Sequence, residues 1–165
     1  LDQGVAQWAG VSNVSIEQLK IAQEILGDKL VAVQNQYSPI HLDTQDTLDY
    51  CAEQGIGFIS FSPLAQGLLT DRYLHGVPAD SRMAQGKFLK QEQLTPELLG
   101  WLRRLQDKAA ARQETLAEMA LAWVLHQKGI TSVLVGASSV AQLEKNLRCV
   151  NAEPFSDADL ADFVP

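Results

Sequence analysis

Short apolar runs alternate with amphipathic stretches along the chain, and this alternation predicts strands and helices in turn. The predicted strands cover residues 5–12, 30–33, 56–61 and 131–135. The predicted helices cover residues 16–26, 44–55, 97–112, 115–126, 139–149 and a short segment after residue 156. Strands that alternate with helices favour a parallel sheet, because parallel neighbours need a crossover connection.

Capping residues set the boundaries of the predicted helices. Ser15 and Thr44 stand where an N-cap is expected, and Gly27 stands where a helix should end. Thr115 and Glu118 have the spacing of a capping box. Residues 64–95 are predicted to form a long loop with a short helix at most, and such loops are usually functional or partly mobile.

Composition limits the class of protein. The 165 residues are 46% hydrophobic, enough for one globular unit spanning residues 1–165. A net charge of −7 disfavours binding to nucleic acid or to an anionic membrane. Two cysteines make neither a disulfide framework nor a metal set, which suits a reducing cytoplasm. No apolar run approaches the ~20 residues of a membrane span, and no signal-peptide pattern opens the sequence.

Polar residues follow the predicted strands, at the ends where parallel β/α folds bind ligands. Three strand ends offer neutral hydrogen-bonding side chains and one offers an aromatic ring. The fourth leads into a helix start, where free N–H groups favour a phosphate. These residues are Ser12, Asn13, Gln34, Phe61, Ser62, Gly136, Ser138 and Ser139. They would suit a planar, amide-bearing ring with a phosphate beside the last helix.

Each of these residues also has a purely structural interpretation. Ser12 fits a turn, Gln34 a loop and Phe61 a core, and Gly136 with Ser139 would start a helix without any phosphate. The sequence contains no motif for metal binding or nucleophilic catalysis. The histidines are scattered and form no zinc set, and no nucleophile elbow, P-loop or G-x-G-x-x-G motif is present. Spacing alone therefore predicts a β/α domain with a candidate nucleotide site.

Four motifs together resemble a known family. They are Gly10-Val-Ser-Asn13, Gln34-x-x-Tyr37, the run from Phe61 to Thr70, and Gly136-Ala-Ser-Ser-x-x-Gln-Leu-x-x-Asn146. In this order and spacing they are similar to the second half of an aldo-keto reductase. The nearest branch contains L-glyceraldehyde 3-phosphate reductase-like enzymes and the β subunits of voltage-gated potassium channels. The resemblance implies an α/β fold, namely strands 5–8 of a (β/α)8 TIM barrel, and the cofactor NADP(H).

The resemblance also implies a role for each matching residue. Ser12, Asn13 and Gln34 would bind the nicotinamide carboxamide, and Phe61 would stack on the ring. The residues implied for the pyrophosphate and other phosphates are Ser62, Pro63, Leu64, Ala65, Gln66, Arg72 and Arg82. Those implied for the adenosine and its 2′-phosphate are Gly136, Ser138, Gln142 and Asn146. Lys145 stands where an acid is common, which favours NADPH over NADH.

No catalytic or metal-binding residue is predicted in this chain. The catalytic Asp, Tyr, Lys and His of the family belong to its first four strands, and Tyr37, Tyr50 and Tyr73 do not match the acid. The chain therefore reads as if it starts within a longer pattern. Four strands would leave two unpaired edges and an uncovered apolar inner face. We expect either a fragment of a longer reductase or a half-barrel that associates, for example as a homo-oligomer.

Three functions fit these residues. The first is an oxidoreductase region that acts on small-molecule aldehydes or ketones with NADP(H). The second is a non-catalytic nucleotide-binding or regulatory protein. The third is a nonfunctional remnant of a truncated gene. Cofactor binding and aldehyde reduction, measured together, separate the three.

Overall fold

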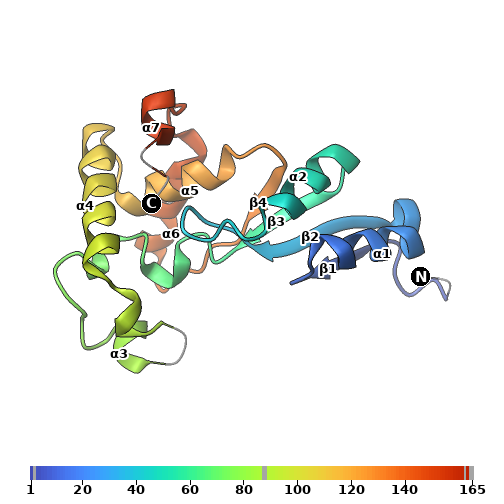
Figure 1. The fold of residues 1–165 in the computed structure, drawn as a ribbon, viewed down its shortest axis with the longest axis horizontal. Coiled ribbons are helices and arrows are strands. Elements are labelled where there is room, and N and C mark those ends of the chain that lie inside the picture. Colours follow the sequence, from blue (N-terminus) through green and yellow to red (C-terminus); the bar gives the residue numbers. More distant parts are fainter. Residues whose placement is uncertain (2, 87–88, 162, 164–165) are drawn as a thin grey trace. The chain divides into compact units, whose positions relative to one another are not determined.

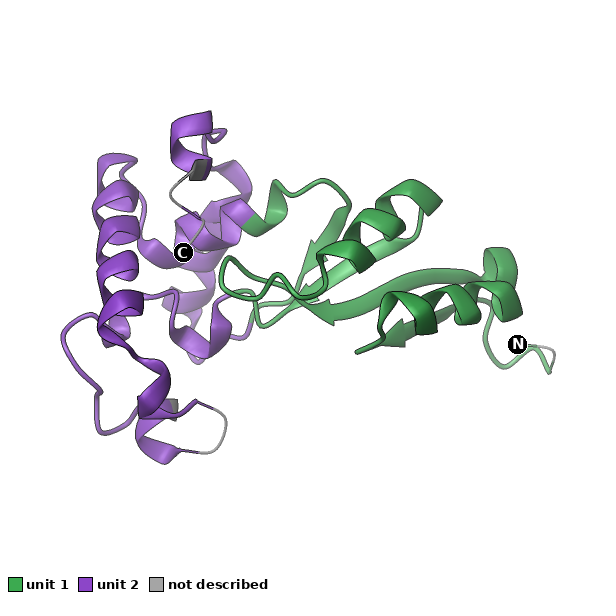
Figure 2. Ribbon diagram, in the orientation of Figure 1, with its two compact units in different colours: residues 1–63, 124–135 green, residues 64–123, 136–165 purple. Residues whose placement is uncertain are grey.

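The computed structural model describes residues 1, 3–86, 89–161 and 163, and the side chains of Arg82 and Ala161 lie outside this description (Figure 1). The chain divides into two compact units (Figure 2). Unit 1 contains Leu1–Pro63 and Val124–Val135, and unit 2 contains Leu64–Trp123 and Gly136–Pro165. The sheet thus belongs to unit 1, and most of the helical residues belong to unit 2.

Unit 1 is built on a parallel sheet. Its strands are β1 (Ala9–Ser12), β2 (Leu30–Gln36), β3 (Gly57–Phe61) and β4 (Ile130–Val133), adjacent in the order β1-β2-β3-β4. The crossovers from β1 to β2 and from β2 to β3 contain α1 (Ile16–Leu26), the 3₁₀ turn Gly27–Lys29 and α2 (Gln45–Gln54). Right-handed crossovers that advance in one direction place their helices on the same face of the sheet. The predicted α/β class with parallel strands is confirmed.

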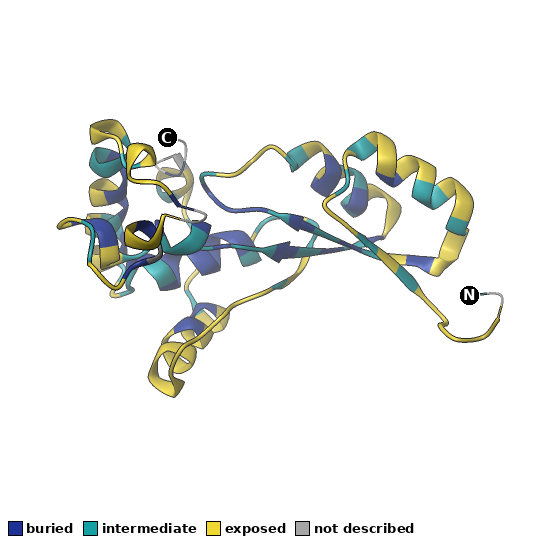
Figure 3. Ribbon diagram, turned by 90° about the horizontal axis from the view of Figure 1, so that it is seen from below, coloured by how far each residue is buried: buried dark blue, intermediate teal, exposed yellow. Residues whose placement is uncertain are grey.

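Burial varies from residue to residue along the strands of the sheet (Figure 3). Successive residues of a strand point to opposite faces, and paired residues of neighbouring strands share a face. On one face, Val33 and Phe58 are fully buried. The opposite face carries Gln34, Ile59 and Phe61, which are only partly buried. The sheet is therefore covered on one side and open on the other.

The open face is not the apolar surface that the sequence predicts. Ser12, Gln34 and Ser132 lie on it in one register row with Ile59. The difference arises because β2 continues past Val33, where the apolar run ends. Residues 34–36 keep their pairing with β3, since the backbone ladder does not depend on apolar side chains. The open face is consequently mixed in polarity.

Two further strand boundaries, those of β1 and β4, were predicted wrongly. Residues 5–8 are not in a strand, and Val5 and Trp8 are 87% and 61% exposed. Those apolar side chains have no sheet to pair with, so β1 starts only at Ala9. β4 covers Ile130–Val133 and stops short of residue 135.

The predicted caps have mixed outcomes. Ser15 caps α1 as predicted: its Oγ accepts from the Gln18 N–H at 3.3 Å. Thr44 stands at the N-cap of α2 but makes no side-chain cap bond. Its hydroxyl instead donates to the Gln36 carbonyl at 2.8 Å, which joins the start of α2 to the end of β2.

Unit 2 is largely helical. Its α-helices are α3 (Arg82–Gln85), α4 (Pro96–Ala111), most of α5 (Leu116–Leu125), α6 (Val140–Leu147) and α7 (Asp157–Ala161). Its 3₁₀ turns are Ala65–Gly67, Asp71–Tyr73, Gln91–Gln93 and Arg148–Asn151. Trp101, Leu105 and Met119 are buried in the core of this unit. The predicted loop over residues 64–95 is confirmed where it is described, in residues 64–86 and 89–95, which contain only short helical turns.

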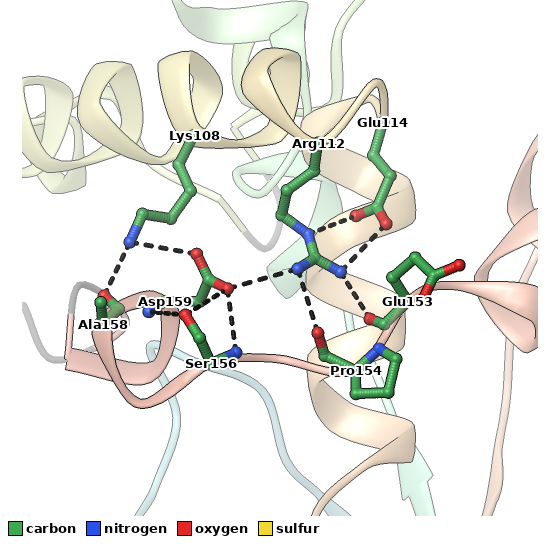
Figure 4. A network of polar contacts seen from close by, with 8 residues as sticks. All are labelled: Lys108, Arg112, Glu114, Glu153, Pro154, Ser156, Ala158 and Asp159. Carbon is green, nitrogen blue, oxygen red and sulfur yellow. Dashed lines mark hydrogen bonds and ion pairs between the residues drawn. The ribbon is translucent and has the colours of Figure 1, made fainter.

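One arginine ties the C-terminal segment to α4 (Figure 4). The Arg112 guanidinium binds the Glu114 carboxylate at 3.2 Å and the Asp159 carboxylate at 3.4 Å. It also donates to the Glu153 and Pro154 carbonyls at 2.6 and 3.4 Å. Hydrogen bonds from Ser156, and then the contact with Lys108, lower the pKa of Asp159.

Candidate functional site

The carboxyl ends of β1 and β2 bring three of the predicted residues together. Ser12 is the register partner of Gln34, so their side chains share the open face of the sheet. The Asn13 N–H donates to the Gln34 carbonyl at 3.0 Å, which extends the ladder by one bond. Ser12 and Asn13 are exposed, and Gln34 is partly buried. The Ser12 hydroxyl and the Gln34 amide therefore lie on one face of the sheet, and Asn13 follows directly in the chain.

A buried asparagine that the sequence reasoning missed supports these strand ends. Asn35 is 1% exposed and lies on the covered face, next to Gln34. Its Oδ1 accepts from the Val14 N–H at 3.1 Å, and its Nδ2 donates to the Val14 carbonyl at 2.8 Å. Both bonds fix the backbone just after Asn13. The available signal was a polar residue at a buried strand position, because such a residue needs partners.

Phe61 lies on the same open face as Gln34. Gln34 pairs with Ile59, and Phe61 is two residues further along β3, so the three side chains point to one side of the sheet. Phe61 is partly buried, and its carbonyl accepts from the Tyr37 N–H at 3.4 Å. The structure thus places an aromatic ring and neutral polar groups on one face, near the carboxyl ends of the strands.

The backbone adopts unusual conformations at these strand ends. Among the described non-glycine residues, five have a positive φ. Four of the five are predicted site residues, namely Asn13 and Ser62 in unit 1 and Ala65 and Gln66 in unit 2. Such conformations cost about 1–3 kcal/mol each and cluster at functional sites. They mark these two loops as positions where the surrounding structure imposes the backbone.

The loop after β3 is built from tight turns. Pro63 is buried at the end of unit 1. In unit 2, the Leu64 carbonyl accepts from the N–H groups of Gly67 and Leu69 at 2.8 and 3.2 Å. Leu68 and Leu69 are buried and anchor this turn, while Gln66 is partly buried at a φ of 60°. The predicted residues 64–66 therefore form one compact turn.

The two predicted arginines have different outcomes. The Arg72 guanidinium binds the Asp80 carboxylate at 2.9 Å and the Asp80 carbonyl at 3.2 Å. Both side chains are exposed, so water and salt weaken this pair. An anion that binds Arg72 would compete with Asp80. The side chain of Arg82 lies outside the described residues.

The start of α6 in unit 2 holds the last group of predicted residues. The Ser139 hydroxyl caps α6 by accepting from the Gln142 N–H at 3.2 Å. The Gln142 Oε1 accepts from the Ser138 N–H and hydroxyl at 2.7 and 3.0 Å. Gly136 is exposed, and a Cβ on it would meet no atom within 4 Å. The capping role that the sequence also allowed is therefore present.

Asn146, further along α6, has an unsatisfied donor. The residue is 5% exposed, and its Nδ2 has no hydrogen-bond partner among the described residues. A buried amide donor without a partner costs about 1–3 kcal/mol. Such an atom fits a ligand that supplies an acceptor, as the ring nitrogens of an adenine do.

The three tyrosines lie in different surroundings. Burial, and then the Asp49 carboxylate, raise the pKa of Tyr37 to about 12, and its hydroxyl donates to Gln45 Oε1 at 2.7 Å. The Tyr50 hydroxyl donates to Gln23 between α2 and α1, and Tyr73 is 1% exposed. The described part of the chain also contains no cluster of three His, Cys, Asp or Glu side chains suited to a metal ion.

The described helices include none that is long and apolar enough to cross a membrane. Both cysteines are free and buried. Burial raises the pKa of the Cys51 thiol to about 11, and burial together with the Glu118 carboxylate raises that of Cys149. Neither thiol has the lowered pKa of a reactive cysteine.

Known proteins match almost the whole chain. An L-glyceraldehyde 3-phosphate reductase of Escherichia coli O157:H7 is 39% identical over 170 residues, which cover 98% of this chain and 49% of that protein. A probable voltage-gated potassium channel subunit beta of Oryza sativa subsp. japonica is 28% identical, over 99% of this chain and 53% of that protein. The chain therefore spans about half the length of these curated relatives.

A solved structure has the same fold. It is a crystal structure of a thermostable aldo-keto reductase in complex with the inhibitor epalrestat, with a TM-score of 0.73 and 21% sequence identity. The superposition covers 99% of this chain and 49% of that one. A family model described as "Aldo/keto reductase family" matches residues 1–164. On this match, the chain belongs to the aldo/keto reductase family.

Proposed function

We propose that this chain is the NADP(H)-binding region of an aldo-keto reductase and corresponds to the second half of the barrel, strands 5–8. The observation that carries the proposal is the shared placement of Ser12, Gln34 and Phe61 on one open sheet face at the strand ends. An aromatic ring beside amide and hydroxyl groups suits a nicotinamide, which has a flat face and a carboxamide at its edge.

The residues present fit the rest of the cofactor. The tight turn over residues 64–66 and the capped start of α6 offer backbone N–H groups for phosphate oxygens. The unpartnered Asn146 Nδ2 would donate to the adenine. Arg72 would exchange its exposed partner Asp80 for a phosphate, since its planar guanidinium binds phosphate oxygens well. Lys145 on α6 favours the 2′-phosphate of NADPH.

NADPH, when bound, supplies a hydride from its C4 to the carbonyl of a small aldehyde or ketone. The role of this chain would be to orient the nicotinamide, with Ser12, Asn13 and Gln34 on the carboxamide and Phe61 on the ring. The proton for the carbonyl oxygen would come from a tyrosine outside the 165 residues. Reduction would therefore need the four β/α units that the longer relatives have in addition.

A second candidate function is non-catalytic nucleotide binding or regulation. It is favoured by the raised pKa of Tyr37 and by the lack, among the described tyrosines, of one placed as a proton donor at the strand ends. The channel β subunits among the relatives agree with it. A reducing cytoplasm suits either function, because both thiols are free.

Two measurements on the purified chain test the proposal. In a fluorescence titration, NADPH should bind saturably and more tightly than NADH. In an assay with 4-nitrobenzaldehyde, the same protein should consume no NADPH. A lack of NADPH binding would contradict the proposed function, and turnover by the chain alone would contradict the absence of a proton donor.

A control identifies the binding residues. Phe61→Ala should weaken NADPH binding about five- to tenfold, since aromatic stacking contributes ~1–1.5 kcal/mol. Phe155 is also a partly buried phenylalanine but belongs to unit 2, and Phe155→Ala should leave the affinity for NADPH unchanged.

A further inference from the structure

An ion pair inside unit 2 closes the loop that starts at Arg72. The Arg72 guanidinium binds the Asp80 carboxylate at 2.9 Å and donates to the Asp80 carbonyl at 3.2 Å. Both residues belong to unit 2, and their side chains are 45% and 82% exposed. Asp80 therefore occupies an arginine that the proposed function assigns to the cofactor.

Two turns of the backbone bring the partners of this pair together. In the first turn, the Gly76 N–H donates to the Tyr73 carbonyl at 3.4 Å, and Gly76 has a φ of 127° that favours glycine. In the second turn, the Ser81 N–H donates to the Pro78 carbonyl at 3.0 Å, so Asp80 is one of the turn residues. The pair thus follows from the local geometry of the loop.

Buried neighbours anchor the backbone at both ends of the pair. Tyr73, next to Arg72, is buried. Ser81, next to Asp80, is also buried, and its hydroxyl accepts from the Ala84 N–H at 3.1 Å. Because the backbone is held while the two charged side chains are exposed, the pair can separate by side-chain rotation without unfolding of the loop.

Thr70 links Arg72 to the tight turn over residues 64–67. The Thr70 hydroxyl accepts from the Arg72 N–H at 3.2 Å and donates to the Gly67 carbonyl at 2.7 Å. The Gly67 N–H in turn donates to the Leu64 carbonyl at 2.8 Å. The backbone of Arg72 is therefore fixed to the turn that the proposed function assigns to the pyrophosphate.

We propose that Asp80 competes with the pyrophosphate of the cofactor for the Arg72 guanidinium. In the free chain, the Asp80 carboxylate holds the guanidinium. When the cofactor binds, the guanidinium turns to the phosphate oxygens and the carboxylate is released to water, since two anions on one guanidinium would repel each other. Binding therefore costs the chain the Arg72–Asp80 pair. Asp80 lowers the affinity for NADPH and NADH alike, because both contain the pyrophosphate.

The exposure of the pair sets the size of this effect. Water and salt weaken an exposed ion pair, and its typical contribution corresponds to a factor of about 1.5 to 5 in an equilibrium constant. Hydrogen bonds from a guanidinium to a phosphate are charge-assisted and stronger, so the cofactor displaces the carboxylate. Asp80 thus reduces the affinity for the cofactor without preventing binding.

The role of Asp80 rests on the proposed function, because it requires a cofactor that reaches Arg72. The two can nevertheless fail separately. A parent chain that binds no NADPH would contradict the proposed function and the role of Asp80 together. A parent chain that binds NADPH, with an Asp80→Asn variant that binds it no more tightly, would overturn the role of Asp80 alone.

Fluorescence titration of Asp80→Asn with NADPH and with NADH is the first test. Asparagine keeps the size of the side chain and removes its charge, so both cofactors should bind about two- to fivefold more tightly than to the parent. Glu92→Gln is the matched control, because Glu92 is also exposed in unit 2 and loses the same charge; it should leave both affinities unchanged. Tightening of NADPH alone would overturn the proposal, since it would place Arg72 on the 2′-phosphate.

A double-mutant cycle shows whether Asp80 acts through Arg72. Arg72→Ala should weaken the binding of NADPH, because it removes the guanidinium. In that background, Asp80→Asn should bring no tightening, because the carboxylate has no guanidinium left to hold. Equal tightening in the presence and absence of Arg72 would show a general effect of charge and would overturn the competition.

The salt dependence gives a further readout that a purely structural role of Asp80 would not change. The parent and the Asp80→Asn variant should differ most in affinity at about 0.1 M salt, and the ratio of their dissociation constants should fall toward one at about 1 M. Salt has this effect because it screens the exposed Arg72–Asp80 pair. A ratio that stays constant over this range would overturn the proposal.

Discussion

The strand ends in unit 1 and the start of α6 in unit 2 hold their polar groups in different ways. At the strand ends, the sheet ladder and the buried Asn35 fix the backbone around Asn13. At α6, Ser138, Ser139 and Gln142 bind one another on an exposed surface. The first arrangement depends on residues far apart in sequence, and the second on a local cap. We therefore expect substitutions at the strand ends to change stability and substitutions at α6 to change mainly ligand affinity.

The largest effect should come from Asn35→Ala. The change leaves the Val14 N–H and carbonyl without their buried partners and should lower the free energy of unfolding by about 3 kcal/mol. Urea denaturation measures this loss. Asn151→Ala, a change of an exposed asparagine, is the control and should stay within about 0.5 kcal/mol of the parent. A loss below 1 kcal/mol for Asn35→Ala would contradict the role of Asn35 in fixing the backbone at Val14.

Arg112→Ala tests whether unit 2 also depends on a contact between residues far apart in sequence, as unit 1 depends on the contact of Asn35 with Val14. It removes a guanidinium that joins α4 to residues 153–159, and we expect a loss of about 2 kcal/mol. Hydrogen exchange should increase over residues 153–159. Arg104→Ala on the same helix is the control, because Arg104 is exposed. Unchanged exchange in the C-terminal segment would show that Arg112 does not hold it.

Stability measured at alkaline pH reports on Tyr37, which is buried next to the end of β2. Because the pKa of Tyr37 is raised to about 12, the folded protein keeps the phenol protonated longer than the unfolded chain does. Stability from this group is fully present below the unfolded pKa of about 10 and is lost as the pH rises through 12. We expect a loss on the order of 1 kcal/mol. Tyr37→Phe should remove this part of the pH dependence, and an unchanged profile would contradict it.

The smallest change in stability should come from Gln142→Ala. Its cap contacts are exposed, so the free energy of unfolding should change by about 0.5 kcal/mol or less. NADPH affinity should nevertheless fall several-fold if α6 binds the adenosine. Gln54→Ala, at an exposed position on α2, is the control for both measurements. A large loss of stability with unchanged NADPH affinity would show that Gln142 serves the fold rather than ligand binding, which contradicts the expectation for α6.

Local signals in the sequence predicted much of the fold. The N-cap at Ser15, the capping box of Thr115 and Glu118 and the apolar core of β3 needed only neighbouring residues, and all three are present in the structure. The resemblance to the family, carried by the motifs at the strand ends, is confirmed by the match over residues 1–164. The polar side chains of those motifs lie at the strand ends where the β/α pattern placed them.

Features that depend on tertiary partners were not predictable in this way. Val5 and Trp8 look like a strand but have no strand to pair with, whereas Gln34 and Gln36 look like a strand end but keep their pairing with β3. Asn35 acquires its role from Val14, 21 residues away. Arg112 reaches residues more than 40 positions further along the chain. No local sequence pattern predicts contacts between residues so far apart in the chain.

Hydrogen exchange with and without NADP⁺ tests the central claim most directly, because it reports where the cofactor binds. The account predicts slower exchange at residues 12–14 and 61–66 and at the start of α6, with little change in α2 and α4. Saturating NADP⁺ that protects neither the strand ends nor the start of α6 would contradict the assignment of this chain as the cofactor-binding region.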